Sequence, residues 1–380
     1  MKRSPPFLGT TGGRFVVSGL VLAAVFGVAV AAWSLLRPGE PVRTETIQDG
    51  LAHPWDMAFA ADGRMLVTER AGRVLVFADG SPDATLLATT TVPDVRAELE
   101  SGLMGIAIHD DTVFVCASRD PGGDAGAPWR VDVLSATLAT DGALSAFTPL
   151  PIGPTLGGPR HQGCAVEIGP DEHLWVTIGD ANLSGDDNPA QDPAILNGKV
   201  LRFELDGSVP GDAPFASGAV SVGHRNPQGI AFREDGIILE VEHGTDVNDE
   251  INRILSGANF GYPCVTGDGV VGPIPDACAA DSNLSPPAWA SGDRTIATSG
   301  AAFLAGEGWG DWEGDLVVTT LKDEDLRRFR VGADGSVTAA ATLLDGQFGR
   351  LRAAVIGPDG ALYLSTANGD DRILRMVKNP

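Results

Sequence analysis

One phrase recurs six times along the chain: an apolar stretch, an acidic turn, and a second apolar stretch that ends in a small or polar residue. In each copy apolar residues alternate around an Asp/Gly turn, which is the pattern of a β-hairpin. The six copies occupy residues 57–70, 105–119, 165–180, 229–244, 300–321 and 353–370. Hairpins repeated at this spacing form one sheet per copy, and such sheets pack radially. The sequence therefore predicts an all-β, six-bladed β-propeller.

The spacing of the copies is uneven. Their turn aspartates step by 49, 60, 64, 80 and 44 residues, at Asp62, Asp111, Asp171, Asp235, Asp315 and Asp359. The longest steps place insertions on either side of the fourth copy, and in a propeller such insertions gather on one face, where a site is built. Helical spacing after residue 37 is confined to short segments such as 93–99 and 192–196. We expect almost no helix in this part of the chain.

An apolar run precedes the first copy. Residues 15–36 carry no charge, follow Lys2, Arg3 and Arg14, and are long enough to span a bilayer. A positive flank stays in the cytoplasm, so the propeller is expected outside it, either membrane-anchored or secreted after cleavage near residues 29–32. The predicted segments are a cytoplasmic basic segment (1–14), a signal peptide or membrane anchor (15–36), a linker (37–49) and the propeller (50–380).

The charge balance bears on the partners. Lys and Arg total 27 against 50 Asp and Glu, a net charge of −23. A nucleic-acid partner is not expected, because a phosphate backbone needs a basic footprint.

The four cysteines fit an oxidising compartment. Cys264 and Cys278 bracket a Gly/Pro-rich loop, and we predict a disulfide that closes it. Cys116 and Cys164 lie in strand-like runs and could either pair or remain buried thiols. The absence of a CxxC motif removes support for a zinc or thioredoxin-type site.

Three polar segments precede the third, fourth and sixth copies, at residues 160–163, 223–229 and 349–352. All three stand where an innermost strand begins, so we expect them to converge on one mouth of the propeller. Several cations aimed at the axis of an acidic protein indicate an anionic ligand. The alternative is that each Arg pairs with an acidic neighbour across blades.

The phrase GHRNPQGIAF (223–232), followed by HGTDVNDEINRILSGANFGYP (243–263), resembles the soluble quinoprotein glucose/sorbosone (aldose sugar) dehydrogenases. Other phrases, such as SGLMGIAIH, IGPDEHLWVTIGD and GRLRAAVIGPDGALYL, extend the resemblance over roughly residues 50–378. That family consists of six-bladed propellers that use pyrroloquinoline quinone (PQQ) and calcium. The resemblance implies an extracytoplasmic enzyme that oxidises an aldose sugar at C1 to its lactone by hydride transfer to calcium-bound quinone, with an unidentified electron acceptor.

The same resemblance implies roles for individual residues. His161 matches the general base, and a neutral imidazole can act as a base near neutral pH. Asp180 matches a carboxylate that orients this ring. Arg225 matches a catalytic cation that stabilises negative charge on the quinone oxygen, and Asn226 matches a quinone contact. Lys322, Arg350 and Arg352 match the cationic cradle for the cofactor carboxylates.

Calcium ligands follow from the same comparison. The backbone carbonyls of Gly244 and Thr245 match the catalytic calcium site, and Glu250 with the Phe260 carbonyl matches a second, structural calcium site. His243 precedes the calcium glycine and is a further candidate for contact with the cofactor.

The sequence also departs from the family pattern. Glu100 stands where Gln is usual, Thr245 replaces Pro, and Ala353 replaces Asp. A carboxylate at position 100 would repel the quinone unless it takes up a proton or pairs with Arg350, Arg352 or Lys322. Two other functions therefore stay open: a non-catalytic carbohydrate- or protein-binding propeller, and a calcium-dependent lactone hydrolase.

Overall fold

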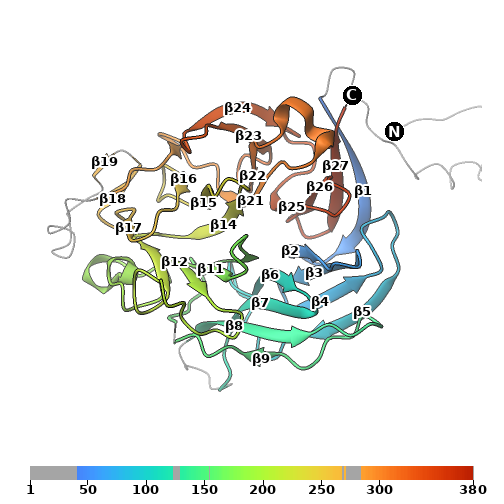
Figure 1. Ribbon diagram of the computed structural model, residues 1–380, viewed down its shortest axis with the longest axis horizontal. Helices are drawn as coiled ribbons and strands as arrows, with labels where there is room; N and C mark the ends of the chain where they lie inside the picture. The colour runs from blue at the N-terminus through green and yellow to red at the C-terminus, as the bar shows by residue number, and fades with distance from the viewer. Residues whose placement is uncertain (1–40, 123–128, 154, 268, 271–283, 380) are drawn as a thin grey trace, which may run out of the picture.

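The computed structural model describes residues 41–379 except 123–128, 154, 268 and 271–283. Six sheets are arranged in a ring around a central axis (Figure 1). This arrangement confirms the predicted six-bladed β-propeller. Blades are numbered I to VI from the first inner strand, and each is a meander from an inner strand to the outer edge.

The inner strands are β2 (Pro54–Phe59), β6 (Leu103–His109), β10 (Gly163–Ile168), β14 (Pro227–Phe232), β21 (Thr298–Phe303) and β25 (Leu351–Ile356). The second strands are β3 (Met65–Glu69), β7 (Thr112–Arg119), β11 (Leu174–Ile178), β15 (Ile238–Glu242), β22 (Leu316–Thr320) and β26 (Leu362–Thr366). The third strands are β4 (Arg73–Phe77), β8 (Arg130–Thr137), β12 (Lys199–Phe203), β16 (Glu250–Arg253), β23 (Leu326–Val331) and β27 (Asp371–Lys378). The outer strands are β5 (Leu86–Thr91), β9 (Thr148–Pro149), β13 (Ala219–Val222), β20 (Trp289–Ala290), β24 (Val337–Leu343) and β1 (Val42–Leu51).

Three short strands lie outside this scheme. β17 (Ala258–Asn259) adds a fifth, parallel strand to blade III, and β18 (Val265–Thr266) pairs with β19 (Gly269–Val270) in a separate hairpin. All six predicted hairpins are confirmed, because each repeated phrase forms the inner two strands of one blade.

Helix is sparse in the described residues, as expected. It is limited to the 3₁₀ segments η1 (Gly185–Asp187), η2 (Pro189–Gln191) and η4 (Glu307–Trp312). Residues 93–99 and 192–196 form turns, so the helical spacing read there was wrong. Nowhere in the described part of the chain is a helix both long and apolar enough to cross a membrane. The apolar run 15–36 lies outside that part.

Blade VI joins the two ends of the fold. β1 pairs antiparallel with β27, from Val42 opposite Lys378 to Leu51 opposite Asp371, and Figure 1 shows the two strands side by side. The linker predicted over 37–49 is therefore wrong from Val42 onward, because those residues close the ring. Their polar sequence, VRTETIQDGL, hid the strand: only Val42, Ile47 and Leu51 are buried.

The hydrophobic core is divided into six clusters, one between each pair of neighbouring blades. Successive side chains of a strand point to opposite faces, so both faces of each sheet must be apolar. On β3, Leu66 packs toward blade II, whereas Met65 and Val67 pack toward blade VI.

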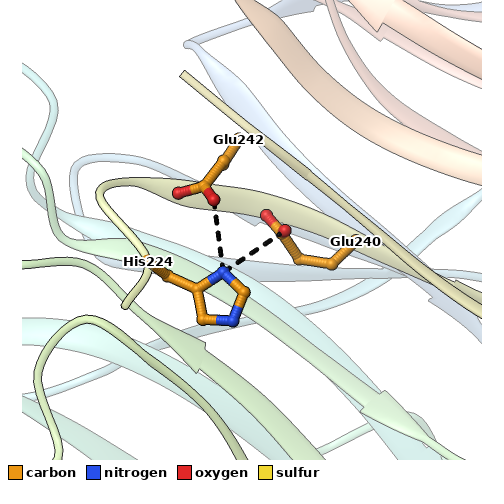
Figure 2. A group of neighbouring side chains, drawn as sticks. All are labelled: His224, Glu240 and Glu242. Atoms are coloured by element: carbon orange, nitrogen blue, oxygen red, sulfur yellow. Dashed lines mark hydrogen bonds and ion pairs between the residues drawn. The ribbon is translucent and has the colours of Figure 1, made fainter. Parts of the chain in front are cut away.

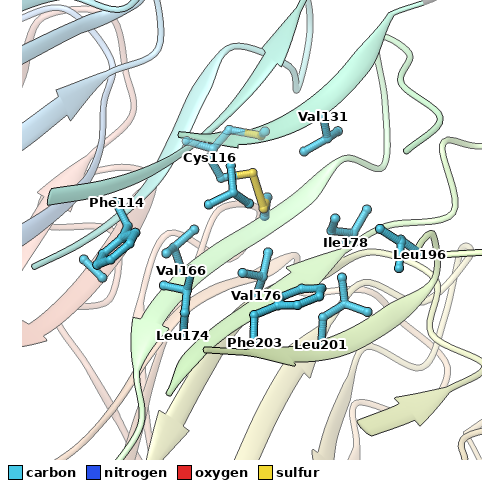
Figure 3. Packing of buried hydrophobic residues seen from close by; sticks show 14 of the residues in the cluster. Phe114, Cys116, Val131, Val166, Leu174, Val176, Ile178, Leu196, Leu201 and Phe203 are labelled. Carbon is cyan, nitrogen blue, oxygen red and sulfur yellow. A yellow bond between two sulfur atoms is a disulfide. The ribbon is translucent and has the colours of Figure 1, made fainter. Parts of the chain in front are cut away.

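A disulfide crosses one of these interfaces. Cys116 on β7 and Cys164 on β10 are bonded within the cluster between blades II and III (Figure 3), with their Cα atoms 6.3 Å apart. Of the two alternatives for these cysteines, pairing is the one observed. Cys264 is also disulfide-bonded. Cys278, its predicted partner, lies outside the described residues.

Candidate active site

The three polar segments meet at one mouth of the propeller. Residues 160–163 lead into β10, 223–229 lead into β14, and 349–352 lead into β25. Glu100, just before β6, joins two of these segments: its Oε2 accepts hydrogen bonds from the His161 backbone amide (3.0 Å) and the Asn226 side chain (3.4 Å). Three consecutive blades thus meet at one carboxylate.

His161 and Asp180 form a buried pair. The His161 Nδ1 lies 2.8 Å from Asp180 Oδ1, and the two side chains are 8% and 0% exposed. The other Asp180 oxygen accepts a hydrogen bond from Asn188 Nδ2 at 2.8 Å. Since an ionised carboxylate only accepts hydrogen bonds, the ring proton is placed on Nδ1 and the lone pair on Nε2.

The local chain explains how this pair is positioned. His161 has a positive φ of 53°, which is uncommon for a residue other than glycine. Gly179, at the end of β11, lies against it: a Cβ on Gly179 would stand 2.1 Å from the His161 carbonyl oxygen. The glycine of the TIGD phrase is therefore what allows the His161 backbone to approach the residue that precedes Asp180.

Glu100 is neutralised differently from the prediction. Its Oε1 pairs with Arg160 Nη1 at 3.0 Å, not with Arg350, Arg352 or Lys322. Burial acts to raise the pKa of this carboxyl. The His161 amide and the positive charges of His243, His161 and Arg160 outweigh burial, so the pKa is lowered. Glu100 therefore carries its charge at the mouth.

Glu242 organises the segment that carries Arg225 and Asn226. Its Oε2 accepts hydrogen bonds from the backbone amides of both residues, at 2.6 and 3.3 Å. The Arg225 guanidinium donates to the His243 carbonyl at 3.3 Å and lies 5.9 Å from the centre of the Tyr262 ring. Its Nε is buried without a hydrogen-bond partner among the described residues.

His243 stands between Asn226 and β21. Its Nε2 donates to the Thr298 carbonyl at 2.6 Å, and its Nδ1 lies 3.4 Å from Asn226 Nδ2. Burial lowers the pKa of His243 in spite of Asp249 and Glu100 nearby. A neutral ring with Nδ1 as acceptor fits both contacts.

Cations without acidic partners occupy the opposite side of the mouth. In the described part of the protein, none of Arg225, Lys322, Arg350 and Arg352 forms an ion pair. Arg352 lies over the Trp55 ring at 3.7 Å and donates to Gln228 Oε1 at 3.2 Å. Burial, with repulsion from Arg350 and Arg70, lowers the pKa of Arg352 to about 9. This result favours the anionic-ligand interpretation over pairing across blades.

Lys322 reaches the same rim by another route. Its backbone amide donates to the Ile296 carbonyl, two residues before β21, and its Nζ donates to Thr295 Oγ1 at 2.7 Å.

Below Arg352 the axial channel carries two carboxyl groups, Asp56 on β2 and Glu167 on β10. Burial raises the pKa of Asp56 to about 7, and burial with the Asp56 charge raises that of Glu167. Neither residue was predicted as part of the site.

The predicted calcium residues line a small cavity beside Arg225. Gly244 and Glu250 contribute to its wall, together with Tyr262. A Cβ on Gly244 would stand 1.9 Å from the Val247 carbonyl oxygen, so only glycine fits. The Gly244 amide donates to Asp249 Oδ1 at 2.9 Å, which fixes the strand end. Thr245 follows on the chain, at the half-buried start of the loop to β16.

Glu250 and Phe260 hold different positions. Burial and the Glu242 charge raise the pKa of the Glu250 carboxyl to about 8, although it accepts a hydrogen bond from the Gly267 amide. Phe260 packs its ring against His224, with the ring centres 4.9 Å apart.

Sequence reasoning missed Glu242 and Asp249 as site residues. Both are buried, and Asp249 accepts hydrogen bonds from three backbone amides, those of Gly244, Ile296 and Ala297. Their signal was present: each is a carboxylate inside or beside an otherwise apolar strand, where burial demands partners.

Comparison with known proteins fits this geometry. The family model described as Glucose / Sorbosone dehydrogenase matches residues 51–375. The chain belongs to this family. The aldose sugar dehydrogenase of Escherichia coli is 32% identical over 88% of this chain and 92% of its own. Quinoprotein glucose dehydrogenase B of Acinetobacter calcoaceticus is 32% identical over 59% of this chain and 52% of its own.

A solved structure extends the likeness to three dimensions. The PQQ-bound aldose sugar dehydrogenase of Streptomyces coelicolor superimposes with a TM-score of 0.72 at 26% identity, covering 89% of this chain and 98% of that one. The family resemblance read from the GHRNPQG and DEIN phrases is thereby confirmed. As a glucose/sorbosone dehydrogenase family member, the chain presents its polar segments on one ring of inner strands.

Proposed function

We propose that this protein is an extracytoplasmic sugar dehydrogenase that oxidises an aldose at C1 to its lactone, with PQQ as oxidant and Ca²⁺ as a Lewis acid. The observation that carries the proposal is the buried His161–Asp180 pair, which shares its mouth with the unpartnered Nε of Arg225. A base with a fixed tautomer and a free cation are the two groups that this oxidation needs.

The residues at the mouth suit a planar tricarboxylate such as this quinone. Arg350 and Arg352 repel one another, and the shifted pKa of Arg352 shows that this region is short of negative charge. Anionic carboxylates would relieve that repulsion, and an Arg fork binds a carboxylate through two parallel hydrogen bonds. We assign Lys322, Arg350 and Arg352 to hold the carboxylates, with Arg225, Asn226 and His243 beside the ring system.

Glu100 opposes this binding only in part. Its charge is already engaged by Arg160 and by the His161 amide, so it faces the site as a paired carboxylate. Its contribution is to align His161 and Asn226 on neighbouring blades.

Calcium is proposed at the carbonyls of Gly244 and Thr245, where Asp249 holds the backbone in place. Backbone carbonyls are ligands that this hard cation accepts. A second, structural calcium is proposed at Glu250 and the Phe260 carbonyl. A calcium ligand would also explain why a carboxylate is kept at the buried Glu250 position.

The chain's own groups then divide the work. When bound, the quinone supplies the two-electron oxidant that accepts the hydride from C1. His161 Nε2 takes the proton of the C1 hydroxyl as the C–O bond becomes the lactone carbonyl. Asp180 holds the ring through Nδ1 and stabilises the imidazolium that forms. Arg225 places its guanidinium where negative charge develops. The electrons then pass to an external acceptor.

The extracytoplasmic location is part of the proposal. It rests on the uncharged run 15–36 behind a basic segment and on disulfide-bonded cysteines, which persist in oxidising compartments. The protein would be membrane-anchored through this run, or secreted if the run is cleaved.

Reconstitution tests the proposal. Purified protein is titrated with PQQ at saturating Ca²⁺, and reduction of a redox dye is followed with a panel of aldoses, with lactone identified by NMR. We expect quinone binding, and dye reduction that needs quinone, Ca²⁺ and sugar together. Failure to bind quinone would favour a binding module, and quinone-independent opening of a lactone would favour the hydrolase.

A further inference from the structure

A second cluster of ionisable side chains lies behind the Arg225 segment, inside blade IV. Glu240 and Glu242 are alternate residues of β15 and share one face, and His224 reaches them from the segment before β14 (Figure 2). The His224 Nδ1 lies 3.2 Å from Glu242 Oε1 and 3.6 Å from Glu240 Oε2. The three residues are at most 3% exposed. Figure 2 shows both carboxylates directed at the same ring nitrogen.

Two oxygen atoms of this cluster lack hydrogen bonds. Glu240 Oε1 and Asn252 Oδ1 are buried without a partner among the described residues, and both side chains are fully buried. The Asn252 Nδ2 stands 2.8 Å from Glu242 Oε1 and 3.1 Å from Glu240 Oε2. Since the two ends of an amide have nearly the same shape, turning Asn252 over would place its unpartnered oxygen at this position.

Charge is also unbalanced here. Glu250 adds a third carboxylate, with its Oε2 3.3 Å from Asn252 Nδ2. Across the described residues, no Lys or Arg side chain forms an ion pair with Glu240, Glu242 or Glu250. Buried carboxylates need a cation, a proton or donors, and unpaired burial is costly.

We propose that His224, Glu240, Glu242 and Asn252 bind a divalent transition-metal ion, with Zn²⁺ as the best match. Four ligand atoms at about 2.1 Å from a tetrahedral ion lie about 3.4 Å from one another. The four measured separations in this cluster are 2.8, 3.1, 3.2 and 3.6 Å. One imidazole with three oxygens suits zinc or manganese, and imidazole is not a ligand for calcium, which takes oxygen.

The ion would act as a structural support. Glu242 contributes Oε1 to the cluster, while its Oε2 holds the backbone amides of Arg225 and Asn226. A metal on Oε1 would fix this carboxylate and hence the segment that presents Arg225. None of the residues assigned to calcium (Gly244, Thr245, Glu250 and Phe260) belongs to the proposed ligand set.

Metal binding is tested on the full chain without quinone or sugar, so the result is independent of the proposed function. Chelator-treated protein is titrated with Co²⁺, whose visible absorption reports coordination, and Zn²⁺ is added to displace it. We expect one Co²⁺ per chain in a tetrahedral N/O ligand field, displaced by Zn²⁺ and not by equimolar Ca²⁺. Absence of stoichiometric binding, or displacement by Ca²⁺, would overturn the proposal.

A variant locates the site. Glu240→Gln removes one ligand while keeping the shape, and it should weaken Co²⁺ binding by at least about tenfold, the smaller loss seen when only an outer-shell partner is changed. The matched control is Glu234→Gln, an exposed residue in the hairpin turn of the same blade, which should bind like the wild type. Equal binding by Glu240→Gln would place the metal elsewhere and contradict the assignment.

X-ray absorption of the zinc-loaded wild type covers the case in which Glu240→Gln does not fold. One imidazole and three oxygens at about 2.0–2.2 Å would support the site. A six-coordinate shell of oxygen alone, or a shell that contains sulfur, would contradict it.

Discussion

At the scale of the single residue, His161 depends on two separate constraints. Asp180 accepts from Nδ1 and sets the tautomer, and Glu100 accepts from the backbone amide and sets the position. The positive φ of His161 is tolerated because Gly179 leaves room for its carbonyl. A base held from both sides loses little entropy when the substrate arrives, which is how positioning contributes to rate.

Replacing His161 by Gln should therefore abolish sugar oxidation without releasing the quinone. Loss of a general base costs about 10²–10⁴-fold in rate. Single-turnover dye reduction and quinone titration on the same preparation give both quantities. His173→Gln is the control, because His173 lies in the turn at the opposite end of β10. Near wild-type turnover in His161→Gln would make this histidine structural.

Glu100 leads to a pH prediction. Because its pKa is lowered, Glu100 stays ionised from about pH 5 to 9, and the stability gained from its charge is lost only as pH falls through that lowered pKa. Glu100→Gln removes a negative charge near the cofactor carboxylates, so quinone affinity should rise by a constant factor over this range. Titrations at several pH values measure it. A gain that grows with pH would show that Glu100 is protonated at the lower end.

At the scale of the strand and the blade, the disulfide joins elements that hydrophobic packing already holds together. Cys116 and Cys164 are separated by 48 residues and connect blades II and III. In the chain-entropy model a loop of this length is worth about 4 kcal/mol.

The double variant Cys116→Ala/Cys164→Ala should lose up to about 4 kcal/mol of unfolding free energy, since the bond restricts the unfolded chain. Urea unfolding without reductant measures the loss. Wild-type protein in reductant is the comparison, although it also opens the disulfide of Cys264. An unchanged urea midpoint in the variant would show that packing alone fixes this interface.

Inner strands were predictable from sequence, whereas outer strands were much less so. An inner hairpin such as β10–β11 is built from alternating apolar residues and a local turn at Asp171, so neighbouring residues carry all the information. β1 has three buried positions in ten, and its partner lies at the far end of the chain. The same limit applies to the site: the positions of His161 and Arg225 followed from their segments. The pairing of Glu100 with Arg160 depends on how two blades meet.

At the scale of the whole molecule, the seam between β1 and β27 decides whether the ring is closed. Removing residues 1–40 should leave the melting temperature of the propeller unchanged, because the first strand begins at Val42. Removing residues 1–51 deletes β1 and leaves β27 as an open edge, a known route to aggregation. We expect this form to be insoluble or to melt at a markedly lower temperature. Equal melting of the two truncated forms would show that blade VI is stable with three strands.

The same seam also sets an order in time. β1 is the first strand of the ring to leave the ribosome and β27 is the last, so β1 waits with both edges unpaired until synthesis is almost complete. Contacts this distant in sequence form slowly, because a long loop must close before any gain is realised. A chain interrupted during translation never acquires its last partner strand. The final pairing thus distinguishes finished molecules from incomplete ones before a site can form at the mouth.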